Sequence, residues 1–425
     1  MYFRFIAISA ALVVVADAST LGDLSPHNAA ADTVETRSDQ DQLLVAFESG
    51  DEEGFQSLIQ SGVDLDFQYP DGSTLLMKAI GVTPLSPYAS YEERKQRRNE
   101  MAKLLILNGA NPNLGANGSS PLLEALRGNK IELARLLIEN RANPNFIDRF
   151  RETSPLIEVA RSSSPEAVNI AELLIQHGAN PNLEFTHYPL LEALYKKNIG
   201  LVNLLIERGA NPNIRDLNLG NTPLIIVTRW KEGAESVEIA NLLINRGADP
   251  NLADTSGHHT PLIDAIRSGH NIAMVELFIN NNANVNQAAW ETTPLICAIY
   301  SGVIDMIQLL IRHGANVDLP SRNGSVTPII AAVLTGNVDT LNFVLNLGAD
   351  PNQATQRGET PLKRAVLNGD VEMVKALADH PGVEVDDAYE FAKQTLTLVS
   401  AINRVRRAIL EAIVKALEPR GPLLK

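Results

Sequence analysis

The side chains that could do chemistry are few in this sequence, and their spacing assembles no reactive site. The chain has eight histidines and one cysteine, Cys297. His258 and His259 are adjacent, and a histidine pair can bind a metal, but no cysteine or carboxylate joins them at ligand spacing. A solvated turn is the better interpretation of this pair. The sequence therefore predicts neither a metal nor a cofactor.

Motifs for nucleophilic catalysis and phosphate binding are absent as well. The sequence contains no P-loop, no His-Glu-x-x-His, no Gly-x-Ser-x-Gly and no EF-hand loop. Cys297 is expected at an exposed helix position, as a spare thiol or as one half of an intermolecular disulfide. We therefore predict that the protein is not an enzyme. An enzyme with an unrecognised site is the alternative from another class.

Composition narrows the class of protein and of partner. Lys plus Arg total 36 and Asp plus Glu total 50, a net charge of −14, which disfavours nucleic acid as a partner. The 45% of hydrophobic residues fits a folded chain. No apolar run reaches the roughly 18 to 20 residues of a membrane-spanning helix. We expect a monomer without an integral membrane segment.

The N-terminus has the pattern of an export signal. Arg4 precedes a run of twelve residues, Phe5 to Ala16, that is apolar apart from Ser9, and Ala16 and Ala18 are small residues at its end. This pattern predicts a signal peptide over residues 1–18, cleaved after Ala18, and hence a periplasmic or secreted protein. A disordered or buried N-terminal helix is the alternative. Residues 19–38 are polar and are interpreted as a flexible leader.

Two motifs recur in phase along most of the chain. One resembles Asn108-Gly109-Ala110-Asn111-Pro112-Asn113, and from position 109 to position 348 its seven steps average about 34 residues. The other is Ser or Thr, then Pro, then Leu or Ile. It begins at Ser120, Ser154, Thr222, Thr260, Thr293, Thr327 and Thr360.

Each motif has a structural meaning. Ser or Thr before Pro predicts a helix N-cap with Pro in the first turn, where its missing N–H costs nothing. The Gly predicts the left-handed end of a second helix. One such unit cannot bury its apolar face alone, so the units are expected to stack into a solenoid.

These motifs resemble the ankyrin repeat family. The resemblance covers about residues 39–386 and implies an all-α solenoid of about ten helix-turn-helix units with β-turn finger loops. The family's usual His after Pro-Leu is absent, so apolar packing is expected there. Tyr188 stands where Thr usually caps, which predicts a weaker helix start.

Residues 387–425 depart from the repeat. Apolar residues from Leu396 to Leu417 form one helical face beside Arg404, Arg406 and Arg407. We interpret this segment as a C-terminal helical cap and tail. Docking of a basic amphipathic helix on a membrane or on a partner is the alternative.

Helical periodicity locates the expected binding surface. Residues two, five and six positions after the Leu of each first helix are expected to face outward, on the concave side that ankyrin-like proteins typically use. The two-on positions form an acidic series that includes Glu124, Glu158 and Asp264. The predicted contact surface takes the five-on and six-on residues Arg161, Tyr195, Arg229, Trp230, Arg267 and Tyr300.

The charges on this surface also have a simpler interpretation. Glu124 with Arg127, Glu158 with Arg161, and Asp264 with Arg267 are i, i+3 pairs that could neutralise each other without a partner. Trp290, in a finger, is a further candidate contact. Longer connections at about residues 81–98, 161–168 and 230–236 are either solvated loops or a second site.

The sequence thus predicts a module that binds a partner protein in an extracytoplasmic compartment. One alternative is an inhibitor or immunity protein that blocks a secreted or periplasmic enzyme, whose association an acidic surface would speed if that enzyme is basic. The other form of this protein-binding function is a scaffold or chaperone for an exported partner, or an effector that acts on a host protein. Membrane association through the C-terminal helix remains a third class.

Overall fold

The computed structural model describes residues 38–81, 91–183, 187–230, 233–269, 272–398 and 404–418. The predicted signal peptide, nearly all of the predicted leader and residues 82–90 of the longest connection lie outside these ranges. The described residues form 22 helices and no strand. Their bounds are α1 Asp39–Ser49, α2 Glu52–Gln60, α3 Leu75–Ile80, α4 Tyr91–Leu107, α5 Pro121–Arg127, α6 Ile131–Glu139, α7 Pro155–Arg161, α8 Ala167–Gln176, α9 Pro189–Tyr195, α10 Ile199–Glu207, α11 Pro223–Thr228, α12 Gly233–Asn245, α13 Pro261–Arg267, α14 Ile272–Asn280, α15 Pro294–Ser301, α16 Ile304–Arg312, α17 Pro328–Leu334, α18 Val338–Asn346, α19 Pro361–Asn368, α20 Val371–Ala378, α21 Asp386–Leu398 and α22 Arg404–Leu417.

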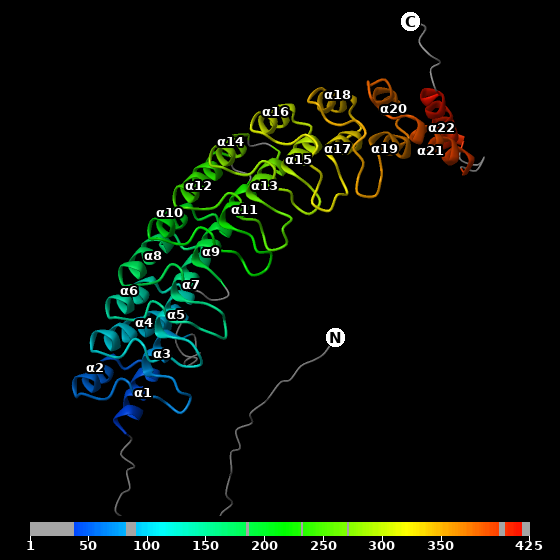
Figure 1. Cartoon of the computed structure of the whole chain (residues 1–425). Helices are drawn as coiled ribbons and strands as arrows, with labels where there is room; N and C mark the ends of the chain where they lie inside the picture. The colour runs from blue at the N-terminus through cyan, green and yellow to red at the C-terminus, as the bar shows by residue number, and fades with distance from the viewer. Residues whose placement is uncertain are drawn as a thin grey trace, which may run out of the picture.

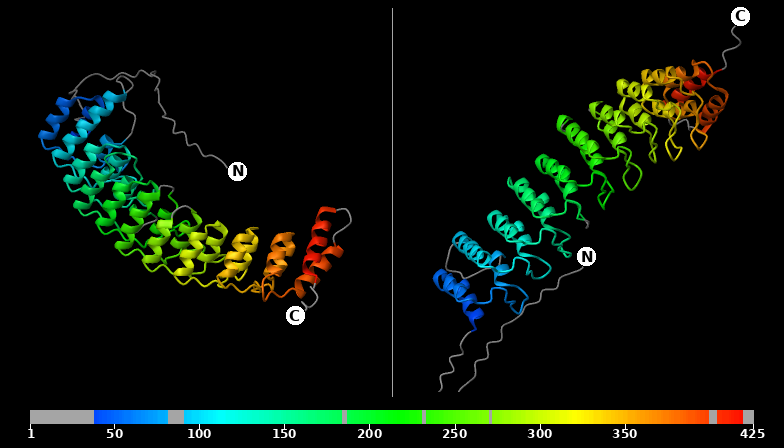
Figure 2. Two further views of the ribbon diagram at one scale, coloured as in Figure 1. Left: turned by 90° about the horizontal axis from the view of Figure 1, so that it is seen from above. Right: turned by 60° about the vertical axis from the view of Figure 1, so that its left-hand side comes forward.

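The helices stack in two rows along an arc. The ten pairs from α1 and α2 to α19 and α20 follow one another as the sequence predicts. The odd-numbered helices and the finger loops lie on the concave side, and the even-numbered helices lie on the convex side (Figure 1). Seen from other directions, the units form one crescent with the fingers hanging from one edge (Figure 2). The concave side is therefore lined by first helices and fingers.

Local capping explains where the first helices begin. The side-chain oxygen of Thr222 accepts a hydrogen bond from the backbone N of Ile225, with Pro in the first turn of α11. The same cap occurs at Ser120, Ser154, Thr260, Thr293, Thr327 and Thr360. Tyr188 makes no such bond at the start of α9. Leu123 and Ile157, where the family has His, are fully buried.

The second helices end in a left-handed residue. Gly109 has φ 92° and Gly178 has φ 91°, a conformation that costs glycine nothing. Arg141 and Asn282 occupy the same place with φ 69° and 65°. Both are more strained there than glycine because they carry a Cβ, and asparagine tolerates this conformation better than arginine.

A ladder of side-chain bonds joins the units below the second helices. Asn213 shows the pattern: its Oδ1 accepts from the backbone N of Asp249 at 2.8 Å, and its Nδ2 donates to the carbonyl of Gly247 at 2.8 Å. Each bond crosses to the next unit. The same two-way bridge is made by Asn113, Asn145, Asn182, Asn251, Asn286 and Asn352.

Three long fingers fold around an aspartate. Oδ1 of Asp216 accepts backbone N–H groups from three successive residues, 218 to 220. Asp148 and Asp254 each accept two backbone N–H groups in the same manner. These bonds give backbone N–H groups of the loop a hydrogen-bond acceptor within the finger, and they fix the shape of each finger.

The C-terminal segment covers the last repeat. Helix α21 packs against α19, and α22 packs against α20 and α21. Leu410, Ile413 and Leu417 of α22 are buried in this contact. The apolar face predicted there is thus used inside the fold, as a cap. Within the described ranges, no helix has the length and apolar character needed to cross a membrane.

Candidate protein-binding surface

The C-terminal ends of the first helices carry five of the six predicted contact residues at the surface. Arg229, Arg267, Tyr195 and Tyr300 are exposed, and Arg161 is half-buried. The tyrosine rings stand well out, with Tyr195 52% and Tyr300 47% exposed. Their predicted exposure is therefore confirmed. Whether they contact a partner stays a prediction.

The sixth residue, Trp230, is buried, and the prediction of its exposure is wrong. Helix α11 ends at Thr228, so the helical periodicity does not extend to position 230. The backbone N of Trp230 bonds to the carbonyl of Val227, and the side chain packs into the core with 9% exposure. Lys197 Nζ lies 5.9 Å from the centroid of its ring. Trp230 therefore belongs to the core.

The two-on positions are also less exposed than predicted. Cys297 is 6% exposed and Asp264 is equally buried, on helices that pack against the first helices of both neighbouring units. Cys297 Sγ lies 3.0 Å from Oγ1 of Thr292. An intermolecular disulfide at this thiol is thus inconsistent with the fold.

Ion pairs on this surface run between units. Arg127 pairs with Glu124 at 3.1 Å as predicted, and also with Glu158 of the next unit at 3.0 Å. The other two predicted i, i+3 pairs do not occur among the described residues. Instead, Arg161 Nη2 lies 3.1 Å from Glu192, and Arg229 Nη2 lies 2.8 Å from Asp264. In both cases the guanidinium group pairs with a carboxylate on the next first helix instead of a carboxylate on its own helix.

Tyr195 is held in place by the next finger. Its hydroxyl donates to Oδ2 of Asp216 at 2.7 Å. Burial and this hydrogen bond raise the pKa of Tyr195 to about 12. The ring is thus a fixed, neutral, half-exposed aromatic surface, which loses little freedom when a partner packs on it.

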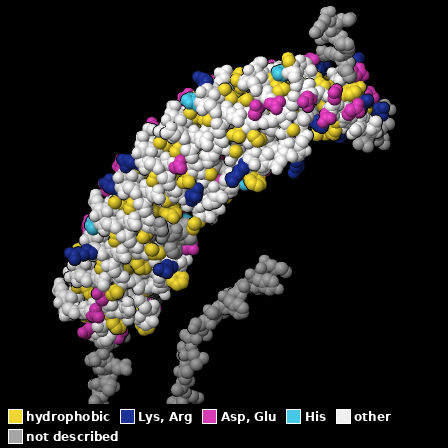
Figure 3. Space-filling model, in the orientation of Figure 1, with side chains coloured by type: hydrophobic (Ala, Val, Ile, Leu, Met, Phe, Trp, Pro, Cys, Tyr) yellow, Lys and Arg dark blue, Asp and Glu magenta, His cyan; other side chains and the backbone are white. Residues whose placement is uncertain are grey.

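Exposed apolar side chains concentrate on the concave side. Of the twelve large apolar side chains that stand well exposed in the described residues, only Leu107 and Ile272 lie on second helices. Figure 3 shows hydrophobic and basic side chains next to each other along the concave edge. We define the concave surface as Phe150, Tyr195, Leu217, Leu219, Trp290 and Tyr300.

Three of these residues were missed by the periodicity argument. Phe150, Leu217 and Leu219 lie in fingers, where no helical period exists, and Phe150 is 84% exposed. The available signal was the presence of large apolar residues in otherwise polar loops. The ring of Phe150 lies over Gly118 of the preceding finger, where a Cβ would collide with it.

Finger length shapes this surface into recesses. Pro189 follows Asn182 by seven residues, whereas Pro155 follows Asn145 by ten and Pro223 follows Asn213 by ten. The short finger leaves a recess of about 240 Å³ between its longer neighbours, floored by α9. Tyr195 and Leu217 line it together with three carboxylates, Glu152, Glu192 and Asp216.

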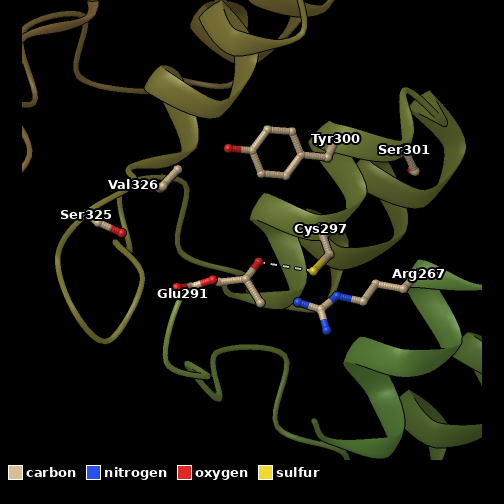
Figure 4. A pocket seen from close by; sticks show the side chains of 8 residues that line it. Arg267, Glu291, Cys297, Tyr300, Ser301, Ser325 and Val326 are labelled. Atoms are coloured by element: carbon tan, nitrogen blue, oxygen red, sulfur yellow. Dashed lines mark hydrogen bonds between the residues drawn. The ribbon is translucent and has the colours of Figure 1, made fainter. Parts of the chain in front are cut away.

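A second recess follows the same rule. The finger before α15 is short, with Pro294 eight residues after Asn286, and the next finger is long. The recess holds about 460 Å³ and is lined by Arg267, Glu291, Cys297 and Tyr300, among others. In Figure 4 the Arg267 side chain reaches from α13 toward Cys297, and Tyr300 stands above them.

The finger with the two histidines forms no catalytic relay. The Ser256 hydroxyl donates to the carboxylate of Asp254 and lies 2.9 Å from Nδ1 of His258. The other histidine, His259, pairs with Asp264 at 2.6 Å. The two histidines thus contact different groups, and Asp254 bonds to Ser256 rather than to the ring of His258. Within the described residues, no three metal-ligating side chains cluster.

Comparison with known families identifies the class of protein. The family model described as ankyrin repeats in three copies matches residues 88–185, 190–289, 262–355 and 321–389. The chain therefore belongs to the ankyrin repeat family, as the repeated motifs predicted. Ankyrin repeats are generally protein–protein interaction modules. No curated protein matches the sequence.

Proposed function

We propose that this ankyrin repeat protein is a monomeric, non-enzymatic module that binds a partner protein on its concave surface, outside the cytoplasm. The observation that carries the proposal is the concentration of exposed aromatic and apolar side chains on fingers and first helices. Large rigid aromatics are enriched at binding hot spots. The extracytoplasmic location rests on the signal-like pattern of residues 1–18.

The arrangement suits recognition of an extended surface. Neighbouring units place equivalent side chains roughly 10 Å apart. The backbone of the units is fixed by helix caps, by the asparagine ladder and by the finger aspartates. A partner docking on such a surface pays for little ordering of the protein itself. The net charge of −14 favours a partner of opposite overall charge, for which association would be faster.

The test is capture of a partner with matched surface variants. The mature chain from Ser19 would be used beside a Phe150→Ser, Leu217→Ser, Trp290→Ser variant and a Leu107→Ser control. Leu107 is an equally apolar, exposed residue at the end of α4, away from the fingers. A partner from the extracytoplasmic fraction that binds the wild type and the control but not the triple variant supports the proposal. Equal capture by all three contradicts it.

A further inference from the structure

Four arginines occupy the same place in the repeat, at the C-terminal end of a first helix. For three of them the next unit supplies a carboxylate. Arg127 pairs with Glu158 at 3.0 Å, Arg161 with Glu192 at 3.1 Å, and Arg229 with Asp264 at 2.8 Å. The fold thus builds the same arginine–carboxylate contact three times, always between adjacent first helices.

Arg267 is the exception. The position that holds a carboxylate in the other units is Cys297, a buried thiol bonded to Thr292. Asp264, three residues before Arg267 on its own helix, is bound by Arg229 and by His259. Among the residues that the structure describes, no carboxylate lies within ion-pair distance of Arg267. Burial raises the pKa of Cys297, so the thiol gives the guanidinium no compensating negative charge at neutral pH.

Arg267 is accessible from outside, although Cys297 beside it is buried. Arg267 and Cys297 line the recess of about 460 Å³ that the short finger before α15 leaves open (Figure 4). Tyr300 lines the same recess and presents its ring to solvent. Glu291 of the short finger is the one acidic residue of the lining, and its charge opposes an incoming anion.

We propose that this recess binds an acidic side chain of the partner, which supplies to Arg267 the carboxylate that Cys297 replaces. The inference rests on the proposed function and names the chemistry of its partner at one point. An arginine–carboxylate bond is charge-assisted, and its geometry already exists in three units of this chain. Tyr300 contacts the residues that flank the acidic side chain. Because the whole chain is acidic, the surrounding partner segment is neutral or basic.

The test uses defined peptides and the full mature chain. The probe is an acetylated and amidated pentapeptide with a central glutamate flanked by phenylalanine and alanine. Matched peptides carry glutamine or lysine instead. A fourth peptide has its only carboxylate at the C-terminus. Binding is followed through the arginine Nε–Hε signals of labelled protein, and the signal lost in Arg267→Gln identifies Arg267.

The expected result is a shift of the Arg267 signal with the glutamate peptide alone. The affinity falls about tenfold or more in Arg267→Gln, as expected for loss of a hydrogen bond between charged groups. Cys297→Asp restores the internal carboxylate and blocks the site, whereas Cys297→Ser and the convex-side Arg312→Gln do not. Glu291→Gln binds the glutamate peptide more tightly.

Other outcomes overturn the inference. Equal binding of the glutamate and glutamine peptides, or unchanged binding by Arg267→Gln, would show that no carboxylate is recognised. Preference for the lysine peptide, together with loss of binding in Glu291→Gln, would show a site for cations. Preference for the peptide with the C-terminal carboxylate would show that the recess binds a chain end and not an acidic side chain. Each leaves the proposed function intact, because capture of a partner by the concave surface is measured without these peptides.

Discussion

At the scale of single residues, burial and neighbouring charges set the pKa of Lys130. Its Nζ donates to the carbonyl of Ile80 at 2.8 Å, where it satisfies the C-terminal end of α3. Burial, and next the charges of Arg98 and Lys95, lower the pKa of Lys130 to about 8. This amine should therefore lose its proton at a pH where most lysines keep theirs.

We expect Lys130 to acylate ahead of other lysines. Its reaction with an amine-specific acylating reagent should reach half its maximal rate near pH 8, against about pH 10 for an ordinary lysine. Mass spectrometry of peptides labelled across a pH series measures this. Lys95→Gln removes one repelling charge and should move the midpoint upward. A midpoint near 10 in the wild type would contradict the assigned environment.

The aspartates inside the long fingers couple stability to pH. Burial alone would raise the pKa of Asp148, but hydrogen bonds from Arg127 and from the backbone of Arg151 and Phe150 lower it. The pKa values of Asp216 and Asp254 are lowered for similar reasons. A lowered pKa in the folded state means that the stabilisation is present above about pH 4 and is lost as the pH falls below it.

Acid should therefore weaken the fold through these carboxylates. The free energy of unfolding by urea is expected to decrease from pH 5 toward pH 2. Asp148→Asn should lower it at pH 7 and make its decrease in acid smaller. Asp339→Asn, on the convex helix α18, is the control. A wild-type stability that is flat between pH 5 and pH 2 would refute the role of the finger aspartates.

At the scale of elements, the asparagine ladder joins each unit to the next. Asn213 makes two bonds to the following unit, and each hydrogen bond contributes about 1 kcal/mol. Asp318 occupies the same place and accepts from the backbone N of Asp350 at 2.9 Å, but a carboxylate has no N–H to donate.

Two substitutions should thus act in opposite directions. Asn213→Ala is expected to destabilise by about 2 kcal/mol, since both bonds are lost. Asp318→Asn is expected to stabilise by up to about 1 kcal/mol, since the amide can donate to the carbonyl of Gly348. Urea unfolding at pH 7 measures both changes. A destabilising effect of Asp318→Asn would contradict the view that the missing N–H donor at position 318 weakens the ladder.

Local sequence signals predicted the elements well and their contacts less well. The Ser/Thr-Pro caps and the helix-ending glycines depend on a few adjacent residues, so helix starts and ends could be predicted. The ion pair of Arg161 with Glu192 joins residues 31 positions apart, and no local rule selects it over Glu158. Trp230 was misplaced because a helix that ends early breaks the period. Phe150 was missed because fingers have no period.

At the scale of the whole molecule, the stack needs a closed end. Each unit is stabilised by its neighbours, so the last repeat depends on whatever covers it. Helices α21 and α22 provide this cover, with Ile413 fully buried. The apolar face of α22 is therefore buried inside the fold and is not free to dock on a membrane.

Removal of the cap should loosen the last repeat first. In a chain ending at Val385, the amide hydrogens of α19 and α20 are expected to exchange with solvent much faster, while those of α5 to α8 keep their protection. Hydrogen exchange with mass spectrometry measures both regions in one sample. Unchanged exchange in α19 and α20 would show that the last repeat is stable without α21 and α22.

We propose that the concave surface is where this protein binds its partner, and one measurement tests this directly. The most direct measurement places a photo-crosslinking amino acid at Trp290 in one variant and at Leu107 in another, both produced in the native organism. We expect a covalent adduct with one partner from position 290 and none from position 107. Adducts from position 107 alone, or the same adduct in equal yield from both positions, would contradict it.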